Sequence, residues 1–367
     1  MYHSHHAICS ILPPHILRKL AEKPELRERA LRAIETTEGF RGVRRALAIL
    51  PLAVPAGTKH RTIFDARNTD KLPGAQVLDE GGALGGDVAV NEAYNYSGET
   101  YDFYQNVFNR NSVDDHGLTL KSTVHYSDGY DNAFWNGNQM IYGDGDGQLF
   151  QRFTICLDVV GHELTHGVTQ NEAGLVYQDQ SGALNESISD VFGSLIKQWA
   201  NNQTADQADW LIGVGLFTGA VQGRAVRSMA APGTAYDDPQ LGKDPQPADM
   251  SQYVQTTDDF GGVHINSGIP NRAFYLAATS IGGYAWQKAG LIWYRALTGS
   301  LSPSADFQAM ANATVTVAGA LFGQNSNEQN SVRDAWNTVG VSPTATQFRA
   351  LSAPPRPRAA AAAARPT

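Results

Sequence analysis

The stretch Val159-Val160-Gly161-His162-Glu163-Leu164-Thr165-His166 carries most of the information about what this chain is. It follows the pattern H-E-x-x-H inside an apolar run of helical character. Residues four apart lie one turn apart on the same helix face, so His162 and His166 can bind one metal ion from one side. Glu163 lies about 100° around the helix from His162. It is badly aimed to ligate the ion and is free to act as a base, which is the arrangement of a zinc peptidase.

A third ligand is expected from Glu186, on a second helix from Asn185 to Ala200 that follows a glycine-bearing turn at Ser181-Gly182. Apolar residues recur in this segment at helical spacing, namely Leu184, Ile188, Val191, Leu195 and Trp199. Two histidines and one glutamate leave the fourth tetrahedral position open for water, as a catalytic zinc site requires. The metzincin pattern is excluded, because it needs Gly and His at positions occupied here by Thr169 and Glu172.

Composition and charge argue against several other classes of protein. The chain has 367 residues, of which 42% are hydrophobic and 17% charged, and its net charge of −8 argues against nucleic-acid binding. No apolar run is long enough to span a membrane, and we expect a monomer. The two cysteines, Cys9 and Cys156, do not indicate a disulfide framework. The N-terminus shows no signal peptide, so we expect a cytoplasmic protein or one secreted by a non-classical route.

Charge and pattern divide the chain. Residues 1–50 hold nine Lys/Arg and five Asp/Glu, whereas the remainder holds 19 and 31. This contrast predicts a basic N-terminal module facing an acidic partner, although a basic surface extension is the alternative. The sequence of this module predicts a helix from Ile16 and another from Pro24 to about Thr37, followed by a linker over 51–57.

The main body is expected to be α+β. Residues 59–150 have a strand-like, Gly-rich pattern, and helices dominate from Ile155 onward, including Asn271–Ser280 and Ser304–Phe322. The stretch Asp144-Gly145-Asp146-Gly147 resembles the start of a calcium loop. Its twelfth position is Ile155 rather than Glu, so a tight turn is the better interpretation.

Further stretches make the chain resemble the thermolysin-type neutral metalloproteases over most of residues 60–345. They are Asn132-Ala133-Phe134-Trp135-Asn136-Gly137, His162 to His166, Tyr177, Gly182-Ala183-Leu184-Asn185-Glu186, Arg227-Ser228-Met229 and Gly261-Gly262-Val263-His264-Ile265-Asn266-Ser267-Gly268. The N-terminal Pro13-Pro14-His15-Ile16-Leu17 more narrowly resembles the protealysin-like branch, whose propeptides are short.

This resemblance implies a fold, a division into domains and an activity. A β-rich N-terminal domain and a mainly α-helical C-terminal domain would meet at a cleft that holds the zinc helix. The expected boundaries are 1–55 for a propeptide and linker, 56–176 and 177–346 for the two domains, and 347–367 for a disordered tail. The activity implied is that of a zinc-dependent endopeptidase, made as a self-processing zymogen, that acts on peptides and proteins. A peptidase dedicated to one partner and a non-catalytic zincin-like binding protein remain as alternatives.

The resemblance also implies roles for individual residues. Glu163 would be the general base, His264 and Tyr177 the donors to the oxyanion, and Asp259 the carboxylate that orients His264. The implied partners of the zinc histidines are Asp190 and Asn185, and the implied substrate-backbone contacts are Asn132, Ala133 and Arg227. An apolar pocket for the residue after the cleaved bond would be lined by Phe150, Phe153, Val159, Ile212 and Val226, for which ordinary core packing is the alternative.

Calcium is doubtful as a second cofactor. Asp158 and Asp209 match acids of the family's double calcium site, but Lys197, Leu211 and Val214 stand where three further acids should be. Losing three carboxylates and gaining a cation should abolish that site. Arg224 likewise replaces an aspartate of a second calcium loop.

The N-terminal module is expected to be a propeptide that covers the cleft as an intramolecular inhibitor. The Cys9 thiolate is a candidate for the open zinc position in the zymogen, and the alternative is an inert cysteine packed under Pro13-Pro14. Self-processing is expected between about Ala46 and Thr58.

Overall fold

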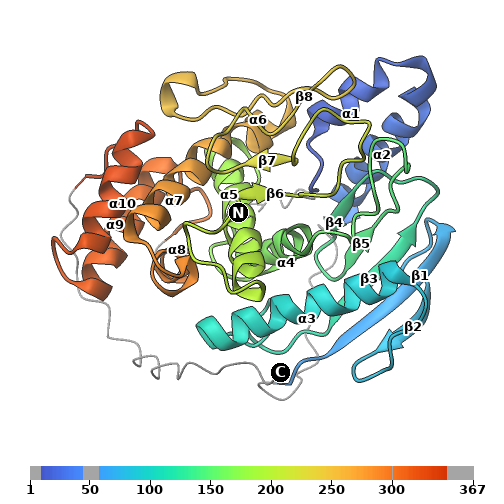
Figure 1. Ribbon diagram of the computed structural model, residues 1–367, viewed down its shortest axis with the longest axis horizontal. Coiled ribbons are helices and arrows are strands. Elements are labelled where there is room, and N and C mark those ends of the chain that lie inside the picture. The colour runs from blue at the N-terminus through green and yellow to red at the C-terminus, as the bar shows by residue number, and fades with distance from the viewer. Residues whose placement is uncertain (1–9, 44–57, 300, 345–367) are drawn as a thin grey trace.

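The computed structural model describes residues 10–43, 58–299 and 301–344 (Figure 1). A β-sheet lies on one side and a group of helices on the other, with α4 and α5 between them (Figure 1). The expected α+β architecture is therefore confirmed. Within the described residues, no helix is both long enough and apolar enough to span a bilayer.

The longer elements account for most of the described residues. The α-helices are α1 (Pro14–Ala21), α2 (Pro24–Val43), α3 (Val88–Phe108), α4 (Leu157–Asn171), α5 (Asp179–Ala200), α6 (Asp259–Asn266), α7 (Gly268–Ile281), α8 (Ala289–Gly299), α9 (Phe307–Phe322) and α10 (Asn327–Thr338), with short 3-10 turns η1 (Met250–Gln252) and η2 (Ala285–Gln287). The strands are β1 (Arg61–Thr69), β2 (Ala75–Asp79), β3 (Leu120–Tyr126), β4 (Ala133–Trp135), β5 (Met140–Tyr142), β6 (Leu211–Ile212), β7 (Arg227–Ser228), β8 (Asp237–Asp238) and β9 (Gly242–Lys243).

The main sheet has five strands in the order β2-β1-β3-β5-β4. The pairs β1–β3 and β3–β5 are parallel, whereas β1–β2 and β4–β5 are antiparallel. Strand β4 is thus an edge strand, and its outer side is met by Ser10, which forms an antiparallel bridge with Phe134. An exposed edge is a ready template for pairing with another extended segment, and here the N-terminal segment of the same chain uses it.

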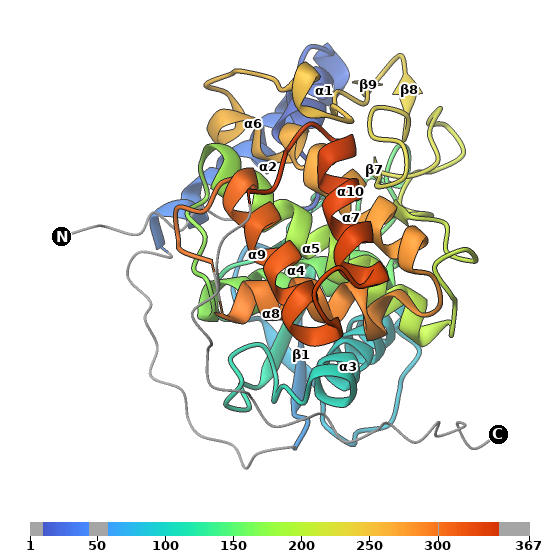
Figure 2. The ribbon, with the colours of Figure 1, turned by 90° about the vertical axis from the view of Figure 1, so that its left-hand side faces the viewer.

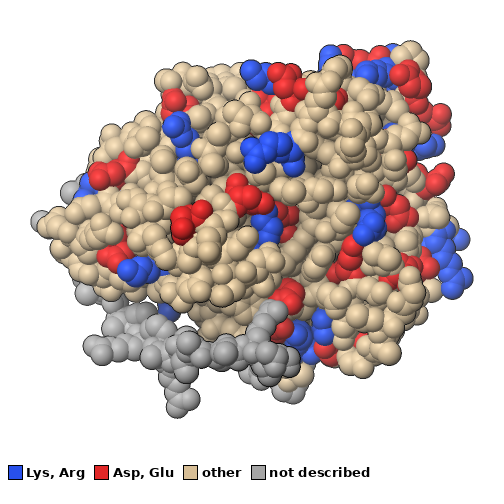
Figure 3. Space-filling model, in the orientation of Figure 1, with Lys and Arg blue, Asp and Glu red and all other residues tan. Residues whose placement is uncertain are grey.

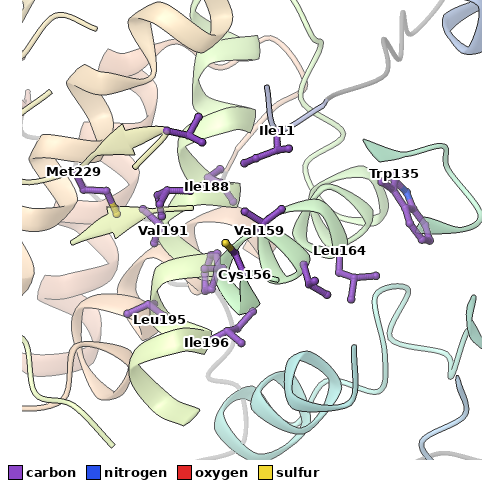
Figure 4. Packing of buried hydrophobic residues seen from close by; sticks show 14 of the residues in the cluster. Ile11, Trp135, Cys156, Val159, Leu164, Ile188, Val191, Leu195, Ile196 and Met229 are labelled. Carbon is purple, nitrogen blue, oxygen red and sulfur yellow. The ribbon is translucent and has the colours of Figure 1, made fainter. Parts of the chain in front are cut away.

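Helices α4 and α5 cross at very short range. A Cβ atom placed on Gly193 of α5 would lie 2.4 Å from the carbonyl oxygen of Asp158 on α4. One placed on Gly161 would lie 2.8 Å from Cδ1 of Ile196. Apolar side chains from both helices fill the space around this crossing, including Val159, Leu164, Ile188, Val191 and Leu195 (Figure 4). Both helices are therefore buried in the centre of the molecule (Figures 1 and 2).

The predicted turn at Ser181-Gly182 is wrong, because α5 begins at Asp179 and both residues are helical. Gly182 serves close packing instead of a turn. A Cβ there would lie 2.5 Å from Cγ1 of Val263 and 3.0 Å from the carbonyl carbon of Tyr177. A glycine that allows two segments to approach closely has the same local pattern as a glycine that ends a helix.

The strand-like interpretation of residues 59–150 missed helix α3. Its buried face mixes alanine and aromatic side chains with Ser97 and Thr100, so the apolar period of a helix is hard to see in the sequence. The helix begins at an N-cap, Asp87, whose carboxylate accepts hydrogen bonds from the amides of Ala89 and Val90. Helices α8 and α10 were not predicted either.

The imidazole of His125, at the end of β3, joins two carboxylates from different segments. Its Nδ1 lies 2.8 Å from Oδ2 of Asp144, and its Nε2 lies 2.9 Å from Oδ2 of the helix cap Asp87. The hydrogen bond with Asp144 is the main reason why the pKa of His125 rises to about 9, against burial, which lowers it. The contact is therefore an ion pair at neutral pH.

This ion pair predicts how stability depends on pH. Because the folded pKa lies above the ordinary value of 6.5, the stabilisation is complete below about pH 6.5 and is lost as pH rises through about 9. The variant His125→Asn keeps a residue that tolerates the left-handed backbone at φ 53° but removes the charge. We expect the melting-temperature difference between wild type and variant to shrink between pH 6.5 and 9.5. A difference that stays constant over this range would contradict the assignment.

Candidate active site

The three predicted zinc ligands meet where α4 and α5 cross. His162 and His166 lie on α4 and Glu186 lies on α5, and all three side chains are buried. The two Nε2 atoms are 3.1 Å apart, and the carboxylate oxygens of Glu186 lie 3.5 Å from Nε2 of His162 and 3.6 Å from Nε2 of His166. In the described part of the chain, no other group of three His, Cys, Asp or Glu residues has this geometry.

The hydrogen bonds of the histidines show why this cluster fits a cation. Nδ1 of His162 lies 2.8 Å from Oδ1 of Asp190, and Nδ1 of His166 lies 2.8 Å from Oδ1 of Asn185. Both Nδ1 atoms face acceptors, so each ring turns the lone pair of its Nε2 toward the other and toward Glu186. Oε2 of Glu186 is buried and has no hydrogen-bond partner among the described residues. Converging lone pairs and an unpartnered carboxylate oxygen are the donor set that Zn²⁺ binds.

Asp190 joins the zinc ligand His162 to Arg227. Besides holding His162, it accepts two hydrogen bonds of 2.8 Å from Arg227, and Nδ2 of Asn271 donates to it at 2.8 Å. Burial opposes the charge of Asp190, but Arg227 and His162 lower its pKa to about 2. Asn271 is a member of this network that the sequence did not reveal, because an asparagine in an apolar helix carries no motif.

Glu163 is fully buried beside the three ligands. Its Oε2 accepts a hydrogen bond of 3.1 Å from the amide of Trp135, while its Oε1 has no partner among the described residues. Burial raises the pKa of Glu163 to about 8, with a further contribution from Glu186. A cation at the neighbouring ligands would favour the ionised form, as a general base requires.

The predicted oxyanion donors, His264 and Tyr177, both lie beside Glu186. Nε2 of His264 is 3.3 Å from the hydroxyl of Tyr177, which also donates to Glu186. Asp259 holds His264 at Nδ1, at 2.7 Å, and at its amide, at 2.9 Å. The left-handed residues Phe260, Gly261 and Gly262 between them make the turn that allows both contacts.

The segment Ser10-Ile11-Leu12 is buried and lies along β4, where Ser10 forms a bridge with Phe134. The amide of Ile11 donates to the carbonyl of Ala133 at 3.2 Å, and the amide of Leu12 donates to Oδ1 of Asn132 at 3.0 Å. Arg227 donates to the carbonyl of Ile11 at 2.9 Å. The carbonyl oxygen of Ser10 lies 3.1 Å from Nε2 of His264. Asn132, Ala133 and Arg227, which were predicted to contact a substrate backbone, therefore contact the backbone of this N-terminal segment, and the peptide bond Ser10–Ile11 lies beside His264.

The five predicted pocket residues are all buried in the same apolar cluster as Ile11. They are Phe150, Phe153, Val159, Ile212 and Val226. Two of them, Val159 and Val226, approach the same point on Gly213, and the rings of Phe150 and Phe153 are 6.1 Å apart. Figure 4 shows Ile11 together with Val159 and Ile188 from the two central helices.

The predicted calcium position holds an ammonium group. Nζ of Lys197 lies 2.8 Å from Oδ2 of Asp158 and 3.0 Å from Oδ1 of Asp209, and it donates to the carbonyl of Leu211 at 2.7 Å. Val214 is half exposed and has no carboxylate to offer. The chain therefore supplies its own cation to the two remaining acids.

Four sequence-based hypotheses fall wholly or largely outside the described residues. They concern the Cys9 thiolate, the linker over 51–57, the processing segment from about Ala46 to Thr58, and the tail 347–367.

Comparison with known proteins assigns a family to this site. The model of the thermolysin metallopeptidase catalytic domain matches residues 56–170, and that of the thermolysin metallopeptidase alpha-helical domain matches residues 173–341. A precursor of protealysin, a metalloproteinase from Serratia proteamaculans, has a similar structure, with a TM-score of 0.84 and 54% identity, covering 91% of this chain and 100% of that one.

Two metalloproteases are similar to this chain in sequence. An extracellular metalloprotease from Pectobacterium carotovorum subsp. carotovorum is 52% identical over 337 residues, which is 91% of this chain and 96% of that protein. Thermolysin from Alicyclobacillus acidocaldarius is 45% identical over 287 residues, which is 76% of this chain and 50% of that protein.

The expectation of a cytoplasmic protein, or of secretion by a non-classical route, is wrong. The relative that is 52% identical is named an extracellular metalloprotease, and this points to secretion. The expectation rested on the N-terminal residues alone, and these do not decide where the protein acts.

The zinc-ligand geometry, the two adjacent family matches and the similarity over nine tenths of the chain lead to one assignment. The chain belongs to the thermolysin metallopeptidase family, and it is a zinc-dependent metalloendopeptidase related to the protealysin precursor.

Proposed function

We propose that the groups around the Ser10–Ile11 bond carry out peptide hydrolysis in the roles that their positions suggest. Zinc, held by His162, His166 and Glu186, would polarise the scissile carbonyl and acidify a water molecule. The observation that carries this proposal is the placement of Ser10–Ile11, whose backbone contacts are those of a substrate strand added to β4.

Glu163 serves as the general base in this proposal. It is buried, close to the zinc ligands, and one of its oxygens is uncommitted. It takes a proton from the attacking water and delivers it to the leaving nitrogen, a transfer worth about 10²–10⁴ in rate.

His264 and Tyr177 stabilise the developing oxyanion. Burial opposes a charge on His264, but Asp259 and Glu186 raise its pKa. Because Nδ1 is bonded to Asp259, a protonated ring donates from Nε2 toward the position of the Ser10 carbonyl oxygen. Asp259 is thus a positioning residue, and it favours the charged form of the donor.

The enzyme prefers an apolar residue directly after the cleaved bond. Ile11 holds that position in the cleft and is fully buried, in the cluster that includes Val159, Ile212 and Val226. Burying such a side chain contributes about 1.5–3 kcal/mol relative to leaving it exposed.

The N-terminal segment acts as an intramolecular inhibitor, and we place its boundary and linker at residues 1–55. Helices α1 and α2 follow the cleft segment directly and pack together at one edge of the molecule (Figures 1 and 2). Basic and acidic residues alternate on this edge (Figure 3), and Arg18 pairs with Asp258 at 3.3 Å. A monomer that binds neither nucleic acid nor membranes completes the proposal, with domains at 56–176 and 177–346 and a tail at 347–367.

Glu163→Gln should abolish proteolysis without loss of zinc. Removing the base should lower casein hydrolysis at least 10²-fold, at the low end for general-base catalysis. Zinc content by atomic absorption should stay at one ion per chain, and the control variant Glu328→Gln, on α10 and outside the zinc site, should behave as wild type. Full activity in zinc-loaded Glu163→Gln protein would refute the mechanism.

Calcium should not stabilise the protein, because Lys197 fills the position between Asp158 and Asp209. Calcium should leave the melting temperature of the wild type unchanged. In Lys197→Met the buried carboxylate of Asp158 loses its counter-charge, and we expect a loss of about 2–3 kcal/mol, somewhat below a fully buried pair. A strong calcium-induced rise in the wild-type melting temperature, measured by calorimetry, would disprove the replacement.

Arg29→Ala should shorten the latency of the full-length precursor. Arg29 of α2 bridges the buried carboxylates of Asp131 and Asp146, so its removal leaves two uncompensated charges under the helix. We expect the lag before casein hydrolysis to fall about fivefold, since breaking such a contact costs at least about 1 kcal/mol. Arg32, on the same helix, is exposed and pairs with Glu28, so Arg32→Ala is the matched control. Equal lags in both variants would show that Arg29 does not anchor the propeptide.

A further inference from the structure

Two carboxylates of the catalytic part form a buried pair beneath the N-terminal segment. The side chains of Asp131 and Asp146 are 2% and 0% exposed. Arg29 of α2 spans them, with Nε 2.9 Å from Oδ2 of Asp131 and Nη2 2.5 Å from Oδ2 of Asp146. The second oxygen of Asp131 is buried and has no hydrogen-bond partner among the described residues. The pair thus has acceptor capacity that Arg29 does not fully use.

Asp146 is held by hydrogen bonds from the catalytic part that do not involve Arg29. Oδ1 of Asp146 accepts hydrogen bonds of 2.9, 2.7 and 2.8 Å from the amides of Gln148, Leu149 and Phe150. These bonds hold the carboxylate in place whether or not α2 is present. The charged form of Asp131 is less favourable, because burial and then the neighbouring Asp146 raise its pKa to about 7 even beside Arg29. A cation beside the pair favours the ionised form of Asp131.

The geometry fits a guanidinium better than a metal ion. Calcium takes six to eight oxygen ligands, usually several carboxylates. Outside the zinc site, the described residues contain no third His, Cys, Asp or Glu that converges with these two. Arg29 instead offers Nε and Nη2 from one edge of a planar fork, one to each carboxylate.

The acidic pair adjoins the part of the cleft that binds residues after the cleaved bond. Asp131 directly precedes Asn132, whose side chain receives the amide of Leu12. Leu12 is the second residue after the Ser10–Ile11 bond. Helix α2 covers this region through Arg29 and through Thr37, whose hydroxyl lies 3.3 Å from that of Tyr130. Departure of the N-terminal segment would uncover the pair next to the bound substrate.

We propose that Asp131 and Asp146 form a guanidinium-binding subsite of the mature enzyme, which the precursor fills with Arg29 and which selects substrates with an arginine two or three residues after the cleaved bond. The inference rests on the proposed endopeptidase function and names a substrate class for it. Arg29 then occupies the position of the substrate arginine, and Ser10-Ile11-Leu12 occupies the position of the substrate backbone.

The test uses the self-processed enzyme and pairs of quenched fluorescent peptides. Each pair has isoleucine after the cleaved bond and differs only in arginine or its neutral isostere citrulline at the second or third position. We expect kcat/KM to be about tenfold higher for the arginine peptide at one of these positions, as for one charge-assisted contact. The gain should appear mainly in KM and should weaken with added salt.

Variants locate the effect. Asp131→Asn and Asp146→Asn should each bring the arginine-to-citrulline ratio close to one. Asp102 lies on α3 and pairs with Lys59, so Asp102→Asn removes a carboxylate elsewhere in the catalytic part and should keep the wild-type ratio. If the two subsite variants fail to mature, the ratio measured on the wild type still decides.

The peptide experiment distinguishes a failure of the arginine subsite from a failure of the endopeptidase function. If the wild type cleaves arginine and citrulline peptides equally well at both positions, the subsite is refuted and the endopeptidase stands. A preference that survives Asp131→Asn would assign the arginine to other residues and overturn the proposal. Failure to cleave any of the peptides would refute the proposed function and the subsite with it.

Discussion

The short-range crossing of α4 and α5 is the constraint on which the rest of the structure depends. Gly193 and Gly161 have no side chain at the crossing, where a Cβ would collide with Asp158 or Ile196 on the partner helix. Only at this separation can Glu186 on one helix reach the two histidines on the other. The apolar residues around the crossing, among them Val159 and Leu195, keep the helices there. The metal chemistry is thus a consequence of backbone packing.

The buried hydrogen-bond network of the site also depends on Asp190. Its carboxylate lies at hydrogen-bond distance from His162, pairs with Arg227 and accepts a hydrogen bond from Asn271, so it joins the zinc ligands to the arginine that contacts Ile11. Such a buried network is costly unless every partner is present, and here each oxygen of Asp190 is satisfied. Arg227 and Asn132 also bind the backbone of Ile11 and Leu12 in the N-terminal segment, and we propose that they bind a substrate backbone in the same way.

The chemistry was easier to predict from the sequence than the scaffold. His162, Glu163 and His166 lie within one helical turn, and Glu186 follows on a clearly periodic segment, so local pattern was enough for them. Helix α3 was missed because its buried face contains polar residues, and the Ser181-Gly182 turn was wrong because a glycine needed for packing resembles one needed for a turn. The contact of Arg29 with Asp131 and Asp146 joins positions more than a hundred residues apart. Local sequence patterns cannot predict a contact over such a separation. The position of Ser10-Ile11-Leu12 along β4 could not be predicted for the same reason.

Anomalous diffraction at the zinc edge, from crystals of the full-length precursor, would show whether the crossing of α4 and α5 holds the metal ion. We expect one strong peak per chain, bounded by Nε2 of His162, Nε2 of His166 and the carboxylate of Glu186. A peak at any other position, or a zinc-loaded active protein with no peak there, would contradict it.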